Sequence, residues 1–164
     1  YSAYERFMMG WMTPRVIVDA ENIELEKLQE SNSALLISTS DQHNLKGNDP
    51  SPTTFYLLEN RQQVGWDEYL PGHGLMLTKV QYTYNNWLTN AVNNTSNRMG
   101  VDLIEADGKE PDYYSNGYYG KASDLFPAGA KEYTKIANHS IEEISEKDGV
   151  IYFKYRGGIT TSTE

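Results

Sequence analysis

Three histidines, His43, His73 and His139, are the side chains of this 164-residue chain best suited to bind zinc. A zinc peptidase helix needs two histidines four residues apart, with a glutamate beside the first as general base. Here no HExxH occurs, and no glutamate follows any of the three histidines. We therefore predict no zinc ligand and no catalytic residue in this chain. His73, within Pro-Gly-His-Gly, is expected in a turn that enters a strand.

The compact motifs of nucleophilic and nucleotide chemistry are absent as well. The chain has no cysteine, no G-x-S-x-G and no P-loop, and Gly72-His73-Gly74 lacks the third glycine of a dinucleotide-binding fingerprint. The formal net charge of -9 argues against nucleic acid or an anionic membrane as the main partner. The same charge allows calcium or a basic protein. No apolar run approaches the roughly 20 residues that span a bilayer.

Acidic residues near one long loop could bind calcium, which takes about six to eight oxygen ligands. These residues are Asp102, Glu105, Asp107, Asp112 and Asp124. Their spacing is not that of an EF-hand. Two interpretations stay open: solvated loop acids, or a structural calcium site.

Four tyrosines in the same loop form two pairs, Tyr113 with Tyr114 and Tyr118 with Tyr119. Tyrosine rings can stack on sugar rings or on peptide side chains. The alternative is that they cover the sheet as a lid. This loop is therefore a possible binding surface.

A charged triplet, Glu59-Asn60-Arg61, ends an apolar run that otherwise has the composition of a core strand. Side chains alternate along a strand, so Glu59 and Arg61 point to the same face. A buried, bonded pair of this kind is costly to break from one side. We predict a structural clamp, with a substrate contact as the alternative.

The first element that must position these groups is a helix. Ser2 and Glu5 have the spacing of a capping box, and Pro14 ends the pattern. Tyr4, Met8 and Trp11 fall on one apolar face. About three turns are marginal alone in water, so the helix must pack on this chain or on a missing segment.

The rest of the chain is predicted to be mainly β, an antiparallel β-sandwich or a barrel-like sheet pair. Asp148-Gly149 suits the type I′ turn of a closing hairpin. The expected strands are 15–20, 22–28, 34–39, 54–62, 74–84, 101–106 and the two arms of that hairpin. Two long loops, 85–100 and 107–124, interrupt the sheets. We divide the chain into a helix (1–14), a β-rich domain (15–158) and a frayed C-terminus (159–164).

Several stretches occur in the order seen in one known family. They are SAYERFMMGWMTP (2–14), FYLLENRQQVGWDEYLPGHGLML (55–77), WLTNAVNNTSNRMGVDLIEADG (87–108), SDLFPAG (123–129) and IANHSIEEISEKDGVIYFKYRGG (136–158). Together they cover nearly the whole chain. The chain resembles the immune inhibitor A-like secreted zinc metalloproteases, peptidase family M-six, especially the Bacteroidetes forms.

The resemblance implies the region C-terminal to the zinc motif of a secreted or cell-surface protein. Zinc would then belong to the parent protein and not to this chain, and the substrate would be a protein or peptide bound through the missing catalytic half. The helix face with Tyr4, Met8 and Trp11 would pack on that missing segment. Lys79 and Gln81 stand where the family often has His and Asp, which leaves open an inactive parent.

We expect the chain alone to be inactive and to support peptide-bond hydrolysis carried out elsewhere in the parent. The alternative is a non-catalytic module of a surface protein that binds glycans or proteins through the tyrosine loop. A third, weaker interpretation is a purely structural spacer.

Overall fold

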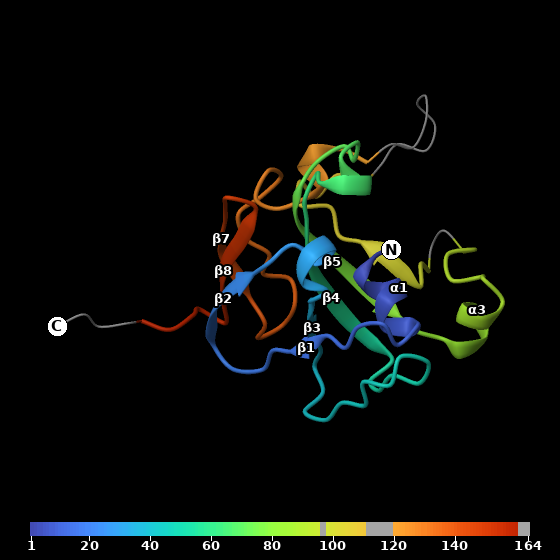
Figure 1. Ribbon diagram of the computed structural model, residues 1–164. Coiled ribbons are helices and arrows are strands. Elements are labelled where there is room, and N and C mark those ends of the chain that lie inside the picture. Colours follow the sequence, from blue (N-terminus) through green and yellow to red (C-terminus); the bar gives the residue numbers. More distant parts are fainter. Residues whose placement is uncertain (96–97, 111–119, 161–164) are drawn as a thin grey trace.

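Short runs rich in Leu, Ile and Val form two β-sheets in the computed structural model, which describes residues 1–95, 98–110 and 120–160. The larger sheet has the order β1 (Arg15–Val16), β3 (Leu35–Ile37), β4 (Thr54–Arg61), β5 (Gly74–Gln81) and β6 (Val101–Leu103). The smaller sheet has the order β2 (Glu21–Leu25), β8 (Val150–Tyr155) and β7 (Ile141–Lys147). The sheets lie face to face and stay open (Figure 1), which confirms the mainly β, sandwich-like prediction.

One strand pair departs from the antiparallel expectation. β1 and β3 run parallel, with Arg15 opposite Leu35, whereas the other strand pairs among the described residues are antiparallel. The chain leaves β1, crosses to the smaller sheet as β2, and returns through the short helix α2 (Leu28–Ser31). Such a crossover brings a strand back in the same direction, which a hairpin cannot do.

The predicted N-terminal helix is α1 (Ala3–Met8), and its capping box is present. The Ser2 hydroxyl accepts a hydrogen bond from the Glu5 N–H at 3.3 Å, and the Glu5 carboxylate accepts from the Ser2 N–H at 2.7 Å. The helix is shorter than predicted because the chain turns away at Gly10, whose φ is +74°.

The apolar face of α1 packs on this chain's own larger sheet. Tyr4 and Met8 are buried in a cluster with Phe55 and Leu57 of β4. Our expectation that these residues pack on a missing segment is therefore wrong for Tyr4 and Met8. Only Trp11 of the predicted face remains exposed, with 54% of its surface accessible.

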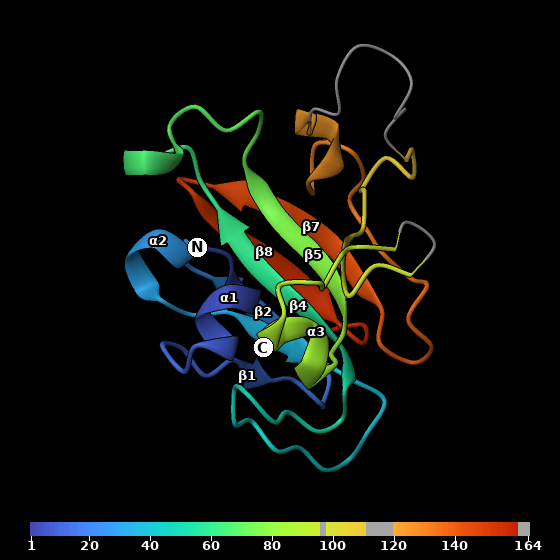
Figure 2. The same cartoon turned by 90° about the vertical axis from the view of Figure 1, so that its right-hand side faces the viewer.

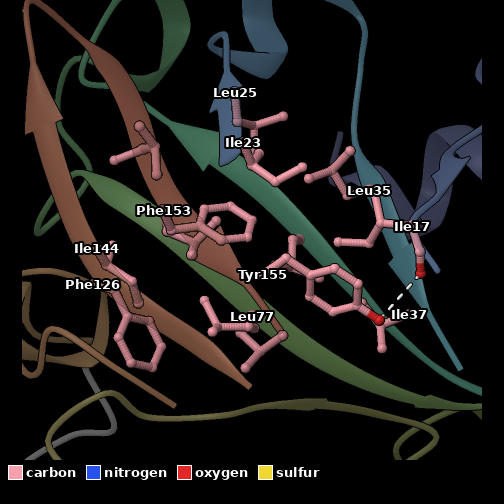
Figure 3. Packing of buried hydrophobic residues seen from close by; sticks show 14 of the residues in the cluster. Ile17, Ile23, Leu25, Leu35, Ile37, Leu77, Phe126, Ile144, Phe153 and Tyr155 are labelled. Carbon is pink, nitrogen blue, oxygen red and sulfur yellow. Dashed lines mark hydrogen bonds between the residues drawn. The ribbon is translucent and has the colours of Figure 1, made fainter. Parts of the chain in front are cut away.

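The core between the two sheets is built by alternate residues of facing strands. Figure 3 shows Ile23 and Leu25 of β2 and Phe153 and Tyr155 of β8 in this cluster. The buried Tyr155 hydroxyl donates a hydrogen bond to the Ile17 carbonyl at 3.3 Å. Since the larger sheet also carries α1 on its other face, β4 buries side chains on both faces, such as Phe55 and Leu58, and this explains its continuous apolar run at 55–58.

The prediction for the closing hairpin is confirmed, whereas the first long loop contains a helix that was not predicted. Asp148 and Gly149 both have positive φ between β7 and β8, as the type I′ prediction requires. The segment 85–100, expected to be a loop, begins inside the helix α3 (Tyr84–Leu88). There Trp87 packs edge-on against Tyr4, a tertiary contact that local sequence does not reveal.

The described residues also include two single-turn 3-10 helices, η1 (Gly65–Asp67) between β4 and β5 and η2 (Ala122–Asp124) before the final hairpin. Near the C-terminus, Ile159 exchanges hydrogen bonds with the side chain of Asn22. Residues 161–164, the rest of the predicted frayed end, lie outside the described residues. Within the described part of the chain, every helix is too short or too polar to cross a membrane.

Candidate functional site

Alternation along β4 separates the polar triplet onto the two faces of the larger sheet. Glu59 and Arg61 lie on the face that carries α1, as the bond from Glu59 to Ala3 shows. Asn60 lies on the face toward the smaller sheet, where it bonds to Leu25. The triplet therefore forms two networks rather than one.

Glu59 is buried, with 1% of its surface exposed, and both carboxylate oxygens are engaged. Oε2 accepts a hydrogen bond from the backbone N–H of Ala3 at 2.8 Å, and Oε1 accepts from Arg61 Nε at 2.6 Å. Burial raises the pKa of Glu59, and the Arg61 charge and the Ala3 N–H offset part of that increase.

Arg61 uses its remaining donors to join two further segments. Nη1 donates to Asp67 Oδ2 at 2.9 Å, and Nη2 donates to the carbonyl of Tyr1 at 3.0 Å. Gln29 of α2 donates to the same Asp67 oxygen at 2.9 Å. We call Glu59, Arg61 and Asp67 the β4 clamp, because together they hold the backbone of residues 1–3 and the β4–β5 connection against the sheet.

Asn60 joins the two sheets, a role that the sequence analysis did not assign. Its fully buried Nδ2 donates to the carbonyls of Leu25 and Gly149, at 2.9 and 2.8 Å. The Gln62 side chain donates to Asn60 Oδ1 at 2.8 Å. The alternation of side chains along β4 could have indicated this role, because Asn60 must lie on the opposite face of the sheet from Glu59 and Arg61.

A pocket of about 330 Å³ lies beside the β4 clamp. Its apolar lining includes Leu70, Pro71, Met76, Leu103 and Leu125. Its charged lining includes Glu5, Arg61, Asp67, Lys121 and Asp124. This volume is at the lower end of the about 300 to 1,000 Å³ typical of small-molecule sites.

The three histidines have separate partners. His43 Nε2 lies 2.6 Å from the hydroxyl of Ser38, which also accepts from the Ser40 N–H and so closes the turn after β3. The other two pairs are His73 with Glu146 at 2.8 Å and His139 with the Tyr155 hydroxyl at 2.5 Å. Burial, together with the charge of Arg156, lowers the pKa of His139.

The donors that the described residues bring together do not fit a zinc site. In the described ranges, no group of three or more His, Asp or Glu side chains could share one ion.

The proposed calcium ligands have varied environments. Asp107 accepts from the Ser123 hydroxyl at 2.7 Å and the Lys109 N–H at 2.9 Å, and these bonds lower its pKa. Asp124 accepts from the Lys121 N–H at 2.7 Å. Burial raises the pKa values of Asp102 and Glu105, with smaller contributions from nearby acids. Asp112 lies outside the described residues, and calcium stays a prediction.

The structure draws attention to aromatic residues other than the predicted ones. Tyr113, Tyr114, Tyr118 and Tyr119 lie outside the described residues, so their role as a binding surface is not tested. Trp66 and Tyr69, which the sequence analysis missed, have 104% and 91% of their surfaces exposed. The sequence could have indicated them, because two large aromatic residues lie three positions apart in a stretch that begins with Gly65.

Comparison with known proteins does not indicate a family or a function for this chain. No protein-family model, no curated protein and no solved structure matches the chain. The function has to follow from the residues of the chain itself.

Proposed function

We propose that this chain is a non-catalytic, β-rich portion of a secreted metallopeptidase-like protein. In this role it supports peptide-bond hydrolysis by a zinc site that other parts of the parent protein provide. The segment with the strongest resemblance, residues 55–77, comprises most of β4, the whole connection and the first half of β5 at the centre of the larger sheet. The motif therefore coincides with the part of the fold that organises its neighbours.

The observation that carries the proposal is that the β4 clamp forms hydrogen bonds to backbone atoms of residues 1–3. Glu59 binds the N–H of Ala3 and Arg61 binds the carbonyl of Tyr1. Bonds to the main chain set its direction whatever side chains it carries. A central strand that fixes residues 1–3 in this way suits a scaffold that orients an adjoining catalytic part.

The placement of the metal follows from the same proposal. Each histidine is engaged with a different partner, at three separate positions in the fold. This supports placing the zinc ligands, and with them the bound peptide, in another part of the parent. Secretion belongs to the parent as well, and it rests on the resemblance alone.

A first experiment reads the coding sequence upstream of the codon for Tyr1. The proposal expects an HExxH within a few dozen codons. Its absence would overturn the link to an active peptidase. The isolated chain should not cleave casein, and zinc-dependent cleavage by the chain alone would contradict the proposal.

A second experiment uses the parent protein and measures chelator-sensitive casein cleavage. Arg61→Met, which breaks the β4 clamp, should lower activity near the melting temperature. Arg15→Met is the matched control, because the Arg15 guanidinium forms an exposed ion pair with Glu21 instead of bonding to residues 1–3. Equal activity of the two variants across the temperature range would contradict a supporting role for the clamp.

A further inference from the structure

A small pocket lies where the open end of the closing hairpin meets the turn that follows β3. The pocket has a volume of about 160 Å³ and is lined by three parts of the chain. These are the end of β1 with the residues after it (16–18), the turn after β3 (38–41 and His43) and the residues at the open end of the hairpin (Asn138, His139 and Arg156). Figure 2 shows the β3–β4 connection in cyan, where it extends below the larger sheet. His139 and Arg156 thus meet groups that are distant from them in sequence.

The hydrogen bonds of Tyr155 determine which ring nitrogen of His139 carries the proton. Burial raises the pKa of Tyr155, so the hydroxyl keeps its proton and donates it to the Ile17 carbonyl (Figure 3). Toward His139 the same hydroxyl can then only accept, and the donor is His139 Nδ1. In the neutral ring the lone pair is therefore on Nε2, which has no protein partner among the described residues.

Arg156 places a fixed positive charge on the same pocket. Its backbone N–H donates to the Ser140 carbonyl at 2.9 Å, and its Nη1 donates to the Val18 carbonyl at 2.7 Å. A guanidinium has several N–H donors in a planar fork, and the others of Arg156 have no partner within the described ranges. Burial, and after it the charge of Arg156, lowers the pKa of His139. The two side chains therefore line one pocket and are close enough to interact electrostatically.

The other charged and titratable groups near His139 come from the segments that pack against it. Asp41 and His43 line the pocket from the turn after β3, and Asp19 lies in the adjoining β1–β2 connection. Within the lining, the opposite charges of Arg156 and Asp41 cancel while His139 is neutral. Protonation of His139 adds a positive charge to the lining, and the pocket then attracts an anion.

We propose that this pocket binds a small oxyanion, a phosphate-like or a carboxylate group, together with one proton. The anion accepts hydrogen bonds from the remaining donors of Arg156 and from Nε2 of protonated His139. Such charge-assisted bonds are among the stronger hydrogen bonds in proteins. The volume is about half of the roughly 300 Å³ at which small-molecule sites begin, so it suits a single ionic group. The positive charge of Arg156 disfavours a metal cation at the same place.

Binding of the anion and binding of the proton must favour each other. An anion beside Arg156 compensates the charge that lowers the pKa of His139, so the pKa of His139 rises when the anion binds. By linkage, the anion binds more tightly as pH falls through that pKa. The net charge of -9 opposes a general attraction of anions, so a response confined to His139 identifies a local site. This role does not use the β4 clamp and does not depend on the proposed support of a peptidase.

Proton NMR titration of the three histidine rings in the full chain tests the proposal. The titration is run in sodium sulfate, in sodium acetate and in sodium chloride alone, at one ionic strength. Sulfate represents phosphate-like ligands and acetate represents carboxylates. At saturation, one or both of these anions should raise the proton affinity of His139 at least about fivefold relative to chloride. His73, which pairs with Glu146 and does not line the pocket, is the internal control and should not respond.

Variants assign the response to the pocket. His139→Gln removes one ring signal and so identifies it. Arg156→Met should raise the proton affinity of His139 in chloride and abolish its response to the anion, whereas Arg156→Lys should keep part of the response. Asp41→Asn should strengthen anion binding, because it removes a negative charge from the lining. Arg98→Met is the matched control, since Arg98 is exposed and does not line the pocket.

The proposal is overturned if His139 responds to neither anion, or if His73 responds equally. It is also overturned if a folded Arg156→Met variant keeps the full response. Circular dichroism establishes that each variant is folded. Should Arg156→Met fail to fold, Asp41→Asn supplies the second test, and anion binding no tighter than that of the wild type would count against the pocket.

Discussion

Replacing Arg61 by methionine would leave Glu59 without its cation. Methionine keeps the aliphatic part of the side chain but removes three hydrogen bonds, those to Glu59, Asp67 and the Tyr1 carbonyl. The Glu59 carboxylate, 1% exposed, would keep only the N–H of Ala3. A charge buried in this way with one neutral donor is strongly destabilising.

The expected cost follows from that burial. Removing one partner of a buried ion pair costs about 3 to 5 kcal/mol. For a protein of this length each kcal/mol lowers the melting temperature by about 2 to 4 °C, so the variant should melt about 6 to 20 °C lower. The control Arg15→Met breaks an exposed ion pair with Glu21 and should cost about 0.2 to 1 kcal/mol.

Thermal and urea unfolding of both variants, followed by circular dichroism, measure the difference. The double variant Glu59→Leu with Arg61→Met should be more stable than Arg61→Met alone, since it removes the buried charge as well. A loss for Arg61→Met no larger than that for Arg15→Met would refute the reasoning. It would mean that the Glu59 carboxylate reaches water or is held without Arg61.

The pH dependence gives a second check on the same variant. Burial already raises the folded-state pKa of Glu59 above its ordinary value of 4.5, and removal of the guanidinium raises it further. When the pKa of a carboxyl is higher in the folded than in the unfolded state, its protonation stabilises the fold. This stabilisation is complete at pH values below the unfolded-state pKa and is lost as pH rises through the folded-state pKa. The cost of Arg61→Met should therefore shrink as pH falls from 7 toward 4.5.

Four further predictions concern other parts of the fold. Asn60→Leu should cost at least about 2 kcal/mol in urea unfolding, because the buried carbonyl of Leu25 and the partly buried carbonyl of Gly149 lose their donor. Gly74→Ala should cost at least about 3 kcal/mol in the same assay, because φ is +132° and a Cβ would collide with the Phe126 carbonyl. The folded state lowers the pKa of His139 below its ordinary value of 6.5, so neutral His139 stabilises the fold fully above pH 6.5, and this contribution is lost as pH falls through the folded-state pKa. His139→Gln should therefore reduce the decline of the urea unfolding midpoint between pH 7 and pH 5. If the acidic loop binds calcium, EGTA should lower the melting temperature, and an unchanged midpoint would contradict that prediction.

The parts of the fold that local chemistry determines were predictable from the sequence. The capping box of Ser2 and Glu5 and the turn at Asp148 and Gly149 each depend on residues a few positions apart. The alternation that separates Glu59 from Asn60 is local as well.

Other parts depend on contacts between distant segments. The partner of Glu59 lies 56 residues away at Ala3, and the second carbonyl bound by Asn60 lies 89 residues away at Gly149. Nothing in the spacing of the triplet identifies either one. In the helix α3, Trp87 likewise contacts the distant Tyr4, and the spacing of the residues in that segment, which was predicted to be a loop, does not reveal this contact.

The polar triplet also explains how one strand can organise a fold that has no disulfide. β4 is buried on both faces. The hydrophobic effect that buries its apolar residues is not directional, so it does not select which segments pack against the strand. Each polar side chain instead accepts only a partner with matching geometry: the backbone of residues 1–3 on one face, and the two carbonyls of the smaller sheet on the other. Hydrophobic burial drives the layers together, and the triplet selects the arrangement in which they meet, because any other arrangement leaves a buried charge or a buried amide without its partner.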